Sequence, residues 1–430
     1  MNIRQFLLLA AVLGSARRAL SQEPATWASP IEGDSSLQAL IAEALQRNPS
    51  IAQRQAVVRA ATLRIRPAGT LPDPMLEVGT IDPFQKFHGF SQIQFELQQE
   101  IPWPGLLAAH AGRARAVETQ ARADVGSARR EVTTTVAAAY YRLRYLVTAL
   151  RTLAEQRRLL DAAVQLSMTR YATGAAPQSD PLQAKLARDR LDAEEFALRG
   201  EYAAAVAALN ALRDRPPMDS LAVAPLDAVA IRTLVSVLPV TDSLVAVAVE
   251  VHPRIAARRA ALAQAGRQVQ VERLGGRPDF FLRVDYQYNG SVPGFNVPDY
   301  PSAFLGMRLP IWAWRKQNRL ADAARADSTA AAAELRDTEL QLSREVTATA
   351  ARVQAAQQRL VLLVDGVLPT ARGTVESVLR TYQVGRTEFL TLLSVEDARY
   401  RAELEAAAVA ADYETQLVML RQLTAGELQP

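Results

Sequence analysis

The chain has 430 residues, with 49 Lys and Arg, 45 Asp and Glu, three His and no Cys. The lack of Cys excludes disulfides, thiolate metal sites, Cys nucleophiles and an acylated N-terminal Cys. Much of the positive excess comes from Arg4, Arg17 and Arg18, because residues 22–430 carry 46 basic and 45 acidic side chains. The composition therefore gives little support for a nucleic-acid-binding protein.

Residues 1–21 have the pattern of a secretory signal peptide. Arg4 supplies the charged start, residues 6–14 form an apolar stretch, and small residues follow around Ala19 and Ser21. The pair Arg17-Arg18 favours the alternative, a short buried N-terminal helix. The apolar stretch has nine residues, whereas a helix needs about 20 to cross a bilayer. We expect a signal peptide at 1–21 and no membrane-spanning helix.

The rest of the sequence contains the same ordered segments twice, at a spacing that drifts from 204 to 211 residues. The paired segments are Asn48-Pro49 and His252-Pro253, Ile101-Pro102-Trp103 and Leu309-Pro310-Ile311-Trp312, and Tyr171-Ala172-Thr173-Gly174 and Tyr382-Gln383-Val384-Gly385. We predict a first repeat over 22–213, a linker over 214–240 whose fold the sequence does not indicate, and a second repeat over 241–430.

Long helices are predicted in both repeats. Residues 105–171 contain no Pro. From Val132 their apolar positions follow a seven-residue period, which is interrupted at Arg157 and Ser167. Such a heptad indicates a supercoiled seam against other long helices. Return helices follow at 178–213 and 387–424. The second long helix is predicted at 312–382, and its heptad pattern is interrupted near Gly366 and Pro369.

Four strands are predicted, at about 74–82, 90–101, 279–289 and 301–311. Two of them alternate clearly, with apolar residues on one face and polar residues on the other. The apolar positions are Ile93, Phe95, Leu97 and Ile101 in one strand, and Leu282, Val284, Tyr286 and Tyr288 in the other. This alternation fits a half-buried soluble sheet, and it equally fits tilted strands that cross a membrane.

Aromatic residues at the strand ends favour the membrane. Trp103, Trp312 and Trp314 lie just beyond the closing prolines, and Tyr300 lies at the opposite end, which is typical of aromatic belts at two membrane interfaces. Since four strands cannot close a barrel and open edges are not tolerated in lipid, we expect oligomers. Three copies would close a barrel of twelve strands.

The motifs occur in the same order in both repeats. In this arrangement they resemble the TolC-type outer-membrane efflux proteins, which are trimeric channel-tunnels. The resemblance runs from about Leu37 to the C-terminus, and the junction Pro102-Trp103-Pro104-Gly105 is more similar to the heavy-metal efflux branch. It implies a mainly α-helical fold with duplicated coiled-coil helices in a trimeric α-barrel and a 12-stranded transmembrane β-barrel. It also implies a location in the outer membrane that extends into the periplasm.

The implied function is a passive conduit from the periplasm to the exterior for metal ions or small toxic molecules. The implied partners are two further copies of the chain, a periplasmic adaptor, an inner-membrane pump and outer-membrane lipid. Docking would involve the tip motifs, with Tyr171 and Gly174 in one repeat and Tyr382 and Gly385 in the other. From their spacing we predict a positive φ at both glycines.

In the family, carboxylates after the tip glycines form rings at the periplasmic entrance. Asp180 matches this pattern, whereas Thr391 and Ser394 stand where carboxylates are common, so Asp180 would act alone or with Glu388. The alternative for Asp180, which precedes Pro181, is a cap on the return helix.

No residue pattern supports catalysis, a cofactor or a metal site. His88, His110 and His252 have no second ligand at helical spacing, and acid pairs such as Glu194-Glu195 and Glu396-Asp397 fit solvated helix faces. The main alternative to a channel is a soluble periplasmic coiled-coil scaffold or adaptor, which would leave the apolar strand faces in water.

Overall fold

The computed structural model describes residues 33–81, 92–233, 235, 238–289 and 298–424. The predicted signal peptide at 1–21, the hairpin loop with His88 and most of the loop after Asn289 lie outside these residues. The described residues divide into two compact units. Unit 1 contains the residues up to Pro49, Arg129–Glu250 and those from Leu342 on, and unit 2 contains Ser50–Ala128 and Val251–Gln341.

These units differ from the predicted division into repeats at 22–213 and 241–430, because each unit draws equivalent segments from both repeats. The reason is that the longest helices, α5 (Leu106–Ala172) and α10 (Gln317–Leu362), contribute residues to both units. The repeat in the sequence is therefore a repeat of elements, not of separate domains.

Unit 2 contains the four-stranded antiparallel sheet and the helices that enter and leave it. Helices α4 (Pro49–Ala68) and α9 (Pro253–Leu274) precede the two strand pairs, β1 (Met75–Ile81) with β2 (Gln92–Ile101) and β3 (Asp279–Asn289) with β4 (Tyr300–Arg308). Each of these helices begins with Pro, whose missing N–H costs nothing at a helix start. His252 replaces the Asn of the first copy and caps α9, since its Nδ1 accepts from the backbone N–H of Arg254 at 3.1 Å.

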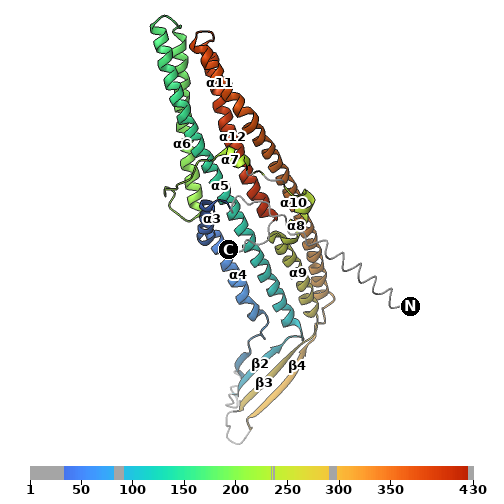
Figure 1. Cartoon of the computed structure of the whole chain (residues 1–430). Helices are drawn as coiled ribbons and strands as arrows, with labels where there is room; N and C mark the ends of the chain where they lie inside the picture. Colours follow the sequence, from blue (N-terminus) through green and yellow to red (C-terminus); the bar gives the residue numbers. More distant parts are fainter. Residues whose placement is uncertain (1–32, 82–91, 234, 236–237, 290–297, 425–430) are drawn as a thin grey trace, which may run out of the picture. The chain divides into compact units, whose positions relative to one another are not determined.

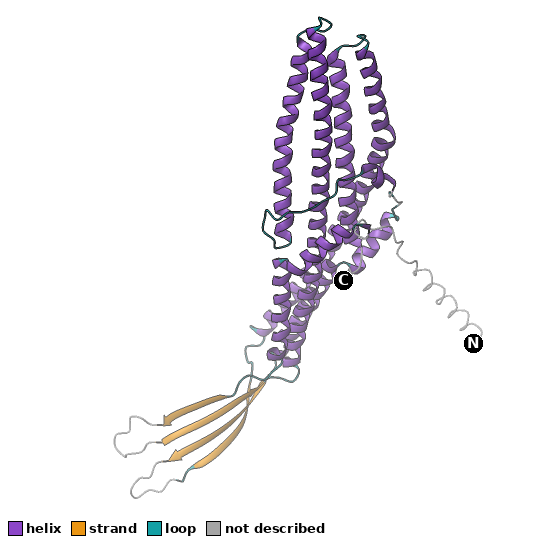
Figure 2. Cartoon of the chain, turned by 60° about the vertical axis from the view of Figure 1, so that its left-hand side comes forward, coloured by secondary structure: helices purple, strands orange, loops and turns teal. Residues whose placement is uncertain are grey.

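Unit 1 contains two helical hairpins. The first joins α5 to α6 (Ser179–Leu212), and the second joins α11 (Leu368–Gln383) to α12 (Phe389–Thr424); both turns lie at the same end of this unit (Figures 1 and 2). Three shorter helices complete the unit, α3 (Ser35–Arg47), α7 (Ala228–Thr233) and α8 (Thr241–Val251). Helix α7 lies within the linker at 214–240, for which the sequence indicated no structure.

The heptad prediction is confirmed within unit 1. Leu146, Leu153 and Leu160 of α5 form one buried cluster with Leu191 and Leu198 of α6. The polar interruption at Arg157 has its own partners, because its guanidinium pairs with Asp192 at 3.2 Å and Glu195 at 3.0 Å, both on α6. The second interruption, Ser167, is buried and donates to the Val164 carbonyl at 2.8 Å.

The last strand ends earlier than predicted, and the helix after it begins later. Strand β4 ends at Arg308 instead of 311, and α10 begins at Gln317 instead of 312. Pro310 cannot donate to the strand ladder, and residues 311–316 form turns in which the Lys316 N–H donates to the Trp312 carbonyl at 3.0 Å.

The helix predicted over 312–382 is also not continuous. A π-helical segment, η1 (Leu363–Val367), separates α10 from α11. Pro369 follows this segment and lacks the N–H of an α-helical hydrogen bond, and a wider π turn is a known response to such a gap. Asp365 in η1 accepts from Arg232 of α7 at 2.7 and 3.0 Å, so the linker is held against this segment.

Candidate functional site

The sheet of unit 2 has an exposed apolar face, whereas its polar face is less exposed on the two central strands. The strands lie in the order β1-β2-β3-β4 (Figure 2). Val284 pairs with Leu97 and Ala303 across the sheet, and it is 44% exposed, whereas Asp285 on the opposite face is 4% exposed. A soluble sheet shows the reverse arrangement. The exposed apolar positions are Leu76, Val78, Phe95, Leu97, Ile101, Leu282, Val284, Tyr286, Tyr288, Leu305 and Met307.

The polar face carries a transverse row of charged and polar side chains. Glu77, Glu96, Asp285 and Ser302 are register partners on four successive strands. Arg283 lies beside this row, 3.8 Å from Glu96 and 3.5 Å from Asp285. This face therefore suits an aqueous lumen and not a hydrophobic core.

The predicted aromatic border lies where the strands give way to helices. Trp103 stacks on Phe280 with ring centroids 6.0 Å apart, and its backbone N–H donates to Asp279 at 3.3 Å. Trp312 and Trp314 are 60% and 58% exposed in the turns before α10, and Tyr300 is exposed at the far end of β4. The positions agree with two aromatic belts.

The two tip turns of unit 1 have the same backbone. Gly174 has φ +70° and Gly385 has φ +75°, so the predicted positive φ is confirmed at both. In each turn the glycine N–H donates to the tyrosine three residues earlier, and the next residue donates five residues back, Ala175 to Arg170 and Arg386 to Thr381. These bonds form a Schellman motif, which favours glycine because a Cβ strains this conformation.

The two hairpins contact each other just below the turns. Arg170 of the first hairpin donates to the Tyr382 carbonyl of the second at 2.8 Å, and its guanidinium lies 4.7 Å from the centre of the Tyr382 ring. Burial raises the pKa of the Tyr382 phenol; Arg170 opposes this shift and Asp180 adds to it. Tyr382 packs in a buried cluster with Ala184 and Phe389. Tyr171, its counterpart in the first repeat, is exposed.

Arg170 is a residue of this site that the sequence does not predict. Its partner belongs to the other repeat, and no local pattern reveals a contact between residues so far apart in the chain. Near Arg170 the structure brings together Tyr382 and Asp180, two of the predicted site residues.

The predicted gate residues lie at the starts of the two return helices. Asp180 is the second residue of α6 and partly exposed, while Gln178 occupies the N-cap position without a side-chain hydrogen bond. Asp180 thus lies in the first turn, where the helix dipole favours a carboxylate, but it does not cap the helix. Glu388, Thr391 and Ser394 are exposed along one face at the start of α12.

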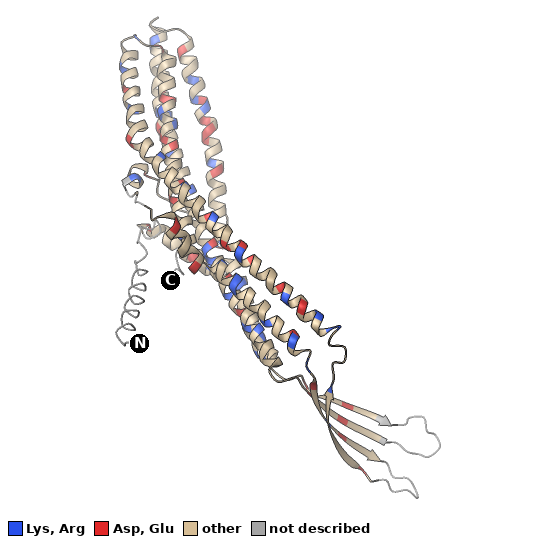
Figure 3. Cartoon of the chain, turned by 90° about the vertical axis from the view of Figure 1, so that its right-hand side faces the viewer, with Lys and Arg blue, Asp and Glu red and all other residues tan. Residues whose placement is uncertain are grey.

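The acid pairs of the long helices are part of ion-pair networks. Glu195 pairs with Arg157 and Arg199, and Glu194 accepts from the Tyr400 hydroxyl at 3.0 Å. Figure 3 shows such charges interspersed along the helices. The expectation of merely solvated faces is therefore wrong for Glu194, which links α6 to α12. Among the described residues no group of three or more His, Asp or Glu is arranged to hold a metal ion.

One buried carboxyl group lies far from the tips. Glu414 of α12 is 8% exposed, and burial raises its pKa to about 7. Arg144 and Tyr141 oppose this shift, and Asp34 adds to it. The sequence gives no signal for this burial, because the residue follows the polar Asp412 in an Ala-rich helix.

Membrane-spanning helices are not found in the described part of the chain, where no helix is both long and apolar enough to cross a bilayer.

Comparison with known proteins relates the second repeat to a family. Residues 244–426 match the family described as outer membrane efflux protein. The second repeat is therefore similar to the outer membrane efflux proteins. Comparison with curated protein sequences gave no significant match.

Solved structures extend the efflux protein fold to the whole chain. VceC from Vibrio cholerae, an outer membrane protein, aligns over 92% of this chain and 98% of its own with a TM-score of 0.75 and 20% identity. CusC aligns over 91% and 92%, with a TM-score of 0.80 and 17% identity. The outer membrane channel MtrE of Neisseria gonorrhoeae, in its open state, aligns over 92% and 90%, with a TM-score of 0.74 and 19% identity. The fold predicted for a single chain, mainly α-helical with four antiparallel strands, is thus confirmed.

Proposed function

We propose that three copies of this outer membrane efflux protein form a passive channel, in which twelve strands close a barrel in the outer membrane and the long helices form a conduit in the periplasm. The observation that carries the proposal is the exposed apolar face of the sheet. In water, such a continuous apolar face would be an aggregation site, whereas in lipid it is the required surface.

The same observation decides against a soluble periplasmic scaffold or adaptor. A scaffold would use the coiled-coil helices but would bury the apolar strand face and expose the polar one. The sheet has the opposite arrangement, with Asp285 and Asn289 buried on its polar face. A soluble protein would also not require the exposed Trp312 and Trp314 at the strand ends.

The channel would work with a periplasmic adaptor and an inner-membrane pump. The tip turns support a docking role, because Tyr171, Gly174 and Gly385 are exposed at the end of the hairpins. The rigid Schellman turns present the same backbone from both repeats, so six equivalent turns in a trimer would offer a regular surface to the adaptor. Metal ions or small toxic molecules remain the predicted substrates.

The entrance would be controlled by Asp180. Three copies of this carboxylate on a threefold axis would attract cations and repel anions. Asp180 lies at the start of α6, close enough to Tyr382 of the second hairpin to affect the pKa of its phenol. In the second repeat Thr391 and Ser394 occupy the equivalent positions, and Glu388 is the carboxylate at the start of the return helix.

Fractionation and planar-bilayer recording test the proposal. The protein should require detergent for extraction, migrate as a trimer and form pores that prefer cations. Asp180→Asn should lower the cation preference, and Asp189→Asn, an exposed acid on the same helix, is the matched control. A protein that stays soluble and monomeric would refute the channel. Unchanged ion preference in Asp180→Asn would refute only the gate assignment.

A further inference from the structure

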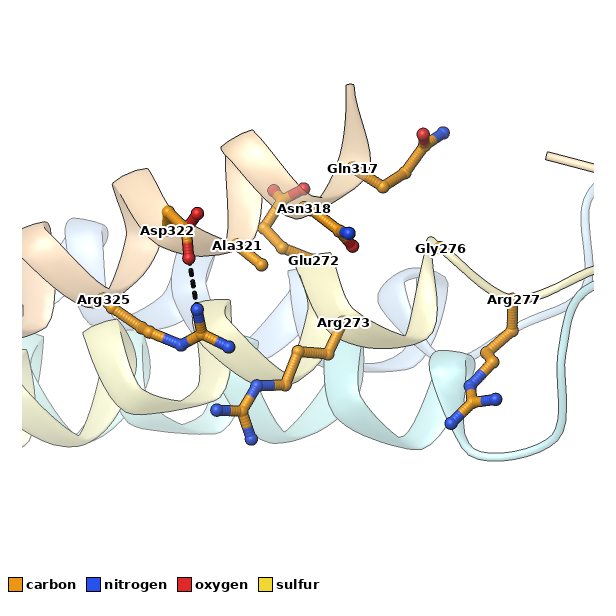
Figure 4. Close-up of a pocket in the computed structure, with 9 residues that line it drawn as sticks. All are labelled: Glu272, Arg273, Gly276, Arg277, Gln317, Asn318, Ala321, Asp322 and Arg325. Carbon is orange, nitrogen blue, oxygen red and sulfur yellow. Dashed lines mark hydrogen bonds and ion pairs between the residues drawn. The ribbon is translucent and has the colours of Figure 1, made fainter. Parts of the chain in front are cut away.

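A polar pocket of about 570 Å³ lies in unit 2 at the junction of helices and sheet. The last turns of α9, the turn that leads into β3 and the first turns of α10 line it (Figure 4). Gly276 is packed so closely that an added Cβ would lie 3.3 Å from the Cβ of Gln317. The volume is within the range of pockets that hold small ligands.

The charge of the pocket is unevenly compensated. Three arginines line it, and Arg325 is paired with Asp322 (Figure 4). Glu272 accepts from the Gln268 amide at 2.6 Å. Arg273 and Arg277 are exposed and form no ion pair within the described ranges. Two guanidinium groups are thus available for an anion.

The surroundings indicate which anion. The guanidinium of Arg277 lies 6.0 Å from the centre of the Trp103 ring, and that of Arg315 lies 4.5 Å from the Trp314 ring. On the strand side of these residues the chain exposes apolar side chains, with Leu309 at 58% and Ile311 at 68%. The order from sheet to helix is therefore apolar side chain, tryptophan and arginine, which is the order of acyl chain, interface and headgroup in a bilayer.

We propose that this pocket binds the phosphate of an anionic glycerophospholipid in the periplasmic leaflet of the outer membrane. The proposal rests on the proposed function, because only a membrane-embedded sheet brings the pocket to headgroup depth. Arg273 and Arg277 hold the phosphate oxygens, as guanidinium groups do in bidentate contacts. Leu309 and Ile311 contact the first methylenes of the acyl chains. A free phosphate would gain nothing from these apolar neighbours.

Native mass spectrometry of the full-length trimer tests the site, with phosphatidylglycerol, diacylglycerol or inorganic phosphate added to the detergent. Phosphatidylglycerol should be retained, and diacylglycerol, which lacks the phosphate, should not. The double variant Arg273→Gln/Arg277→Gln should bind phosphatidylglycerol about 30-fold more weakly, given the usual contribution of each basic residue near an anionic surface. The control Arg54→Gln/Arg59→Gln removes two exposed arginines from α4 of the same unit and should bind as the parent does.

The outcomes separate this site from the channel itself. Equal retention of phosphatidylglycerol by parent and double variant would overturn the site, as would competition by inorganic phosphate at the concentration of the lipid. Detergent extraction and trimer migration of the parent, recorded in the same preparation, report on the proposed function. A parent that inserts but retains no anionic lipid would therefore contradict the lipid site and leave the channel intact.

Discussion

A lysine at Val284 is the sharpest test of which sheet face meets lipid. Val284 lies in the middle of β3 between Leu97 and Ala303, and its side chain is 44% exposed on the apolar face. A lysine near the bilayer midplane costs about 2 to 4 kcal/mol in a membrane strand. Because a trimer contains the substitution three times, assembly would lose about 6 to 12 kcal/mol.

The matched control is Gln94→Lys, on the polar face, where Gln94 pairs with Gly79 and Gln287. A lysine in an aqueous lumen keeps its hydration, so we expect a change below about 1 kcal/mol. Urea titration of each variant folded into lipid vesicles gives the free energies, and electrophoresis without boiling gives the trimer yield. Equal losses for the two variants, or a larger loss for Gln94→Lys, would refute the assignment of faces.

Two further predictions concern the helical unit. Gly385→Ala should destabilise the tip by about 1 to 2 kcal/mol, because Gly385 has a left-handed backbone. Gly373→Ala, in the interior of α11 with free space around it, should stabilise the helix by about 0.5 to 1 kcal/mol. Thermal unfolding followed by circular dichroism compares the two variants, and a change in stability of the same sign in both would contradict the Schellman assignment. The pKa of Glu414, raised to about 7, favours the neutral acid in the folded state, so stability should be fully present below pH 4.5 and should fall by roughly 3 kcal/mol as the pH rises through 7. Glu414→Gln should remove this fall in urea unfolding at pH 5 and pH 8, and a fall that persists in the variant would assign it to another group.

The elements and their order could be predicted from the sequence because local signals determine them. Alternation placed β2 and β3 within two residues of their observed ends. The exposed apolar face of the sheet also followed from alternation once the aromatic ends were considered. Periodicity and capping act over a few residues, so they are visible in one sequence.

Features that depend on distant contacts could not be predicted. The pairing of Arg157 with α6, the contact of Arg170 with Tyr382 and the burial of Glu414 all join segments far apart in the chain. In the sequence, the π-helical segment at Leu363–Val367 was visible only as an interruption of the heptad pattern. A Pro within a helix permits a kink, a break or a wider turn, so the pattern does not indicate which of these forms. The mixing of both repeats in each unit likewise depends on the packing of helices that cross from one unit to the other.

The strand order β1-β2-β3-β4 leaves two unpaired edges on every chain, at β1 and at β4. In the proposed trimer each β1 pairs with the β4 of a neighbour, so a dimer would still expose two edges to the hydrocarbon, as a monomer does. Since each unpaired backbone group costs several kcal/mol in lipid, nearly all of the gain arrives when the third chain closes the ring. Assembly within the membrane should therefore be all-or-none, with monomers and closed trimers in equilibrium and dimers scarcely populated at any concentration.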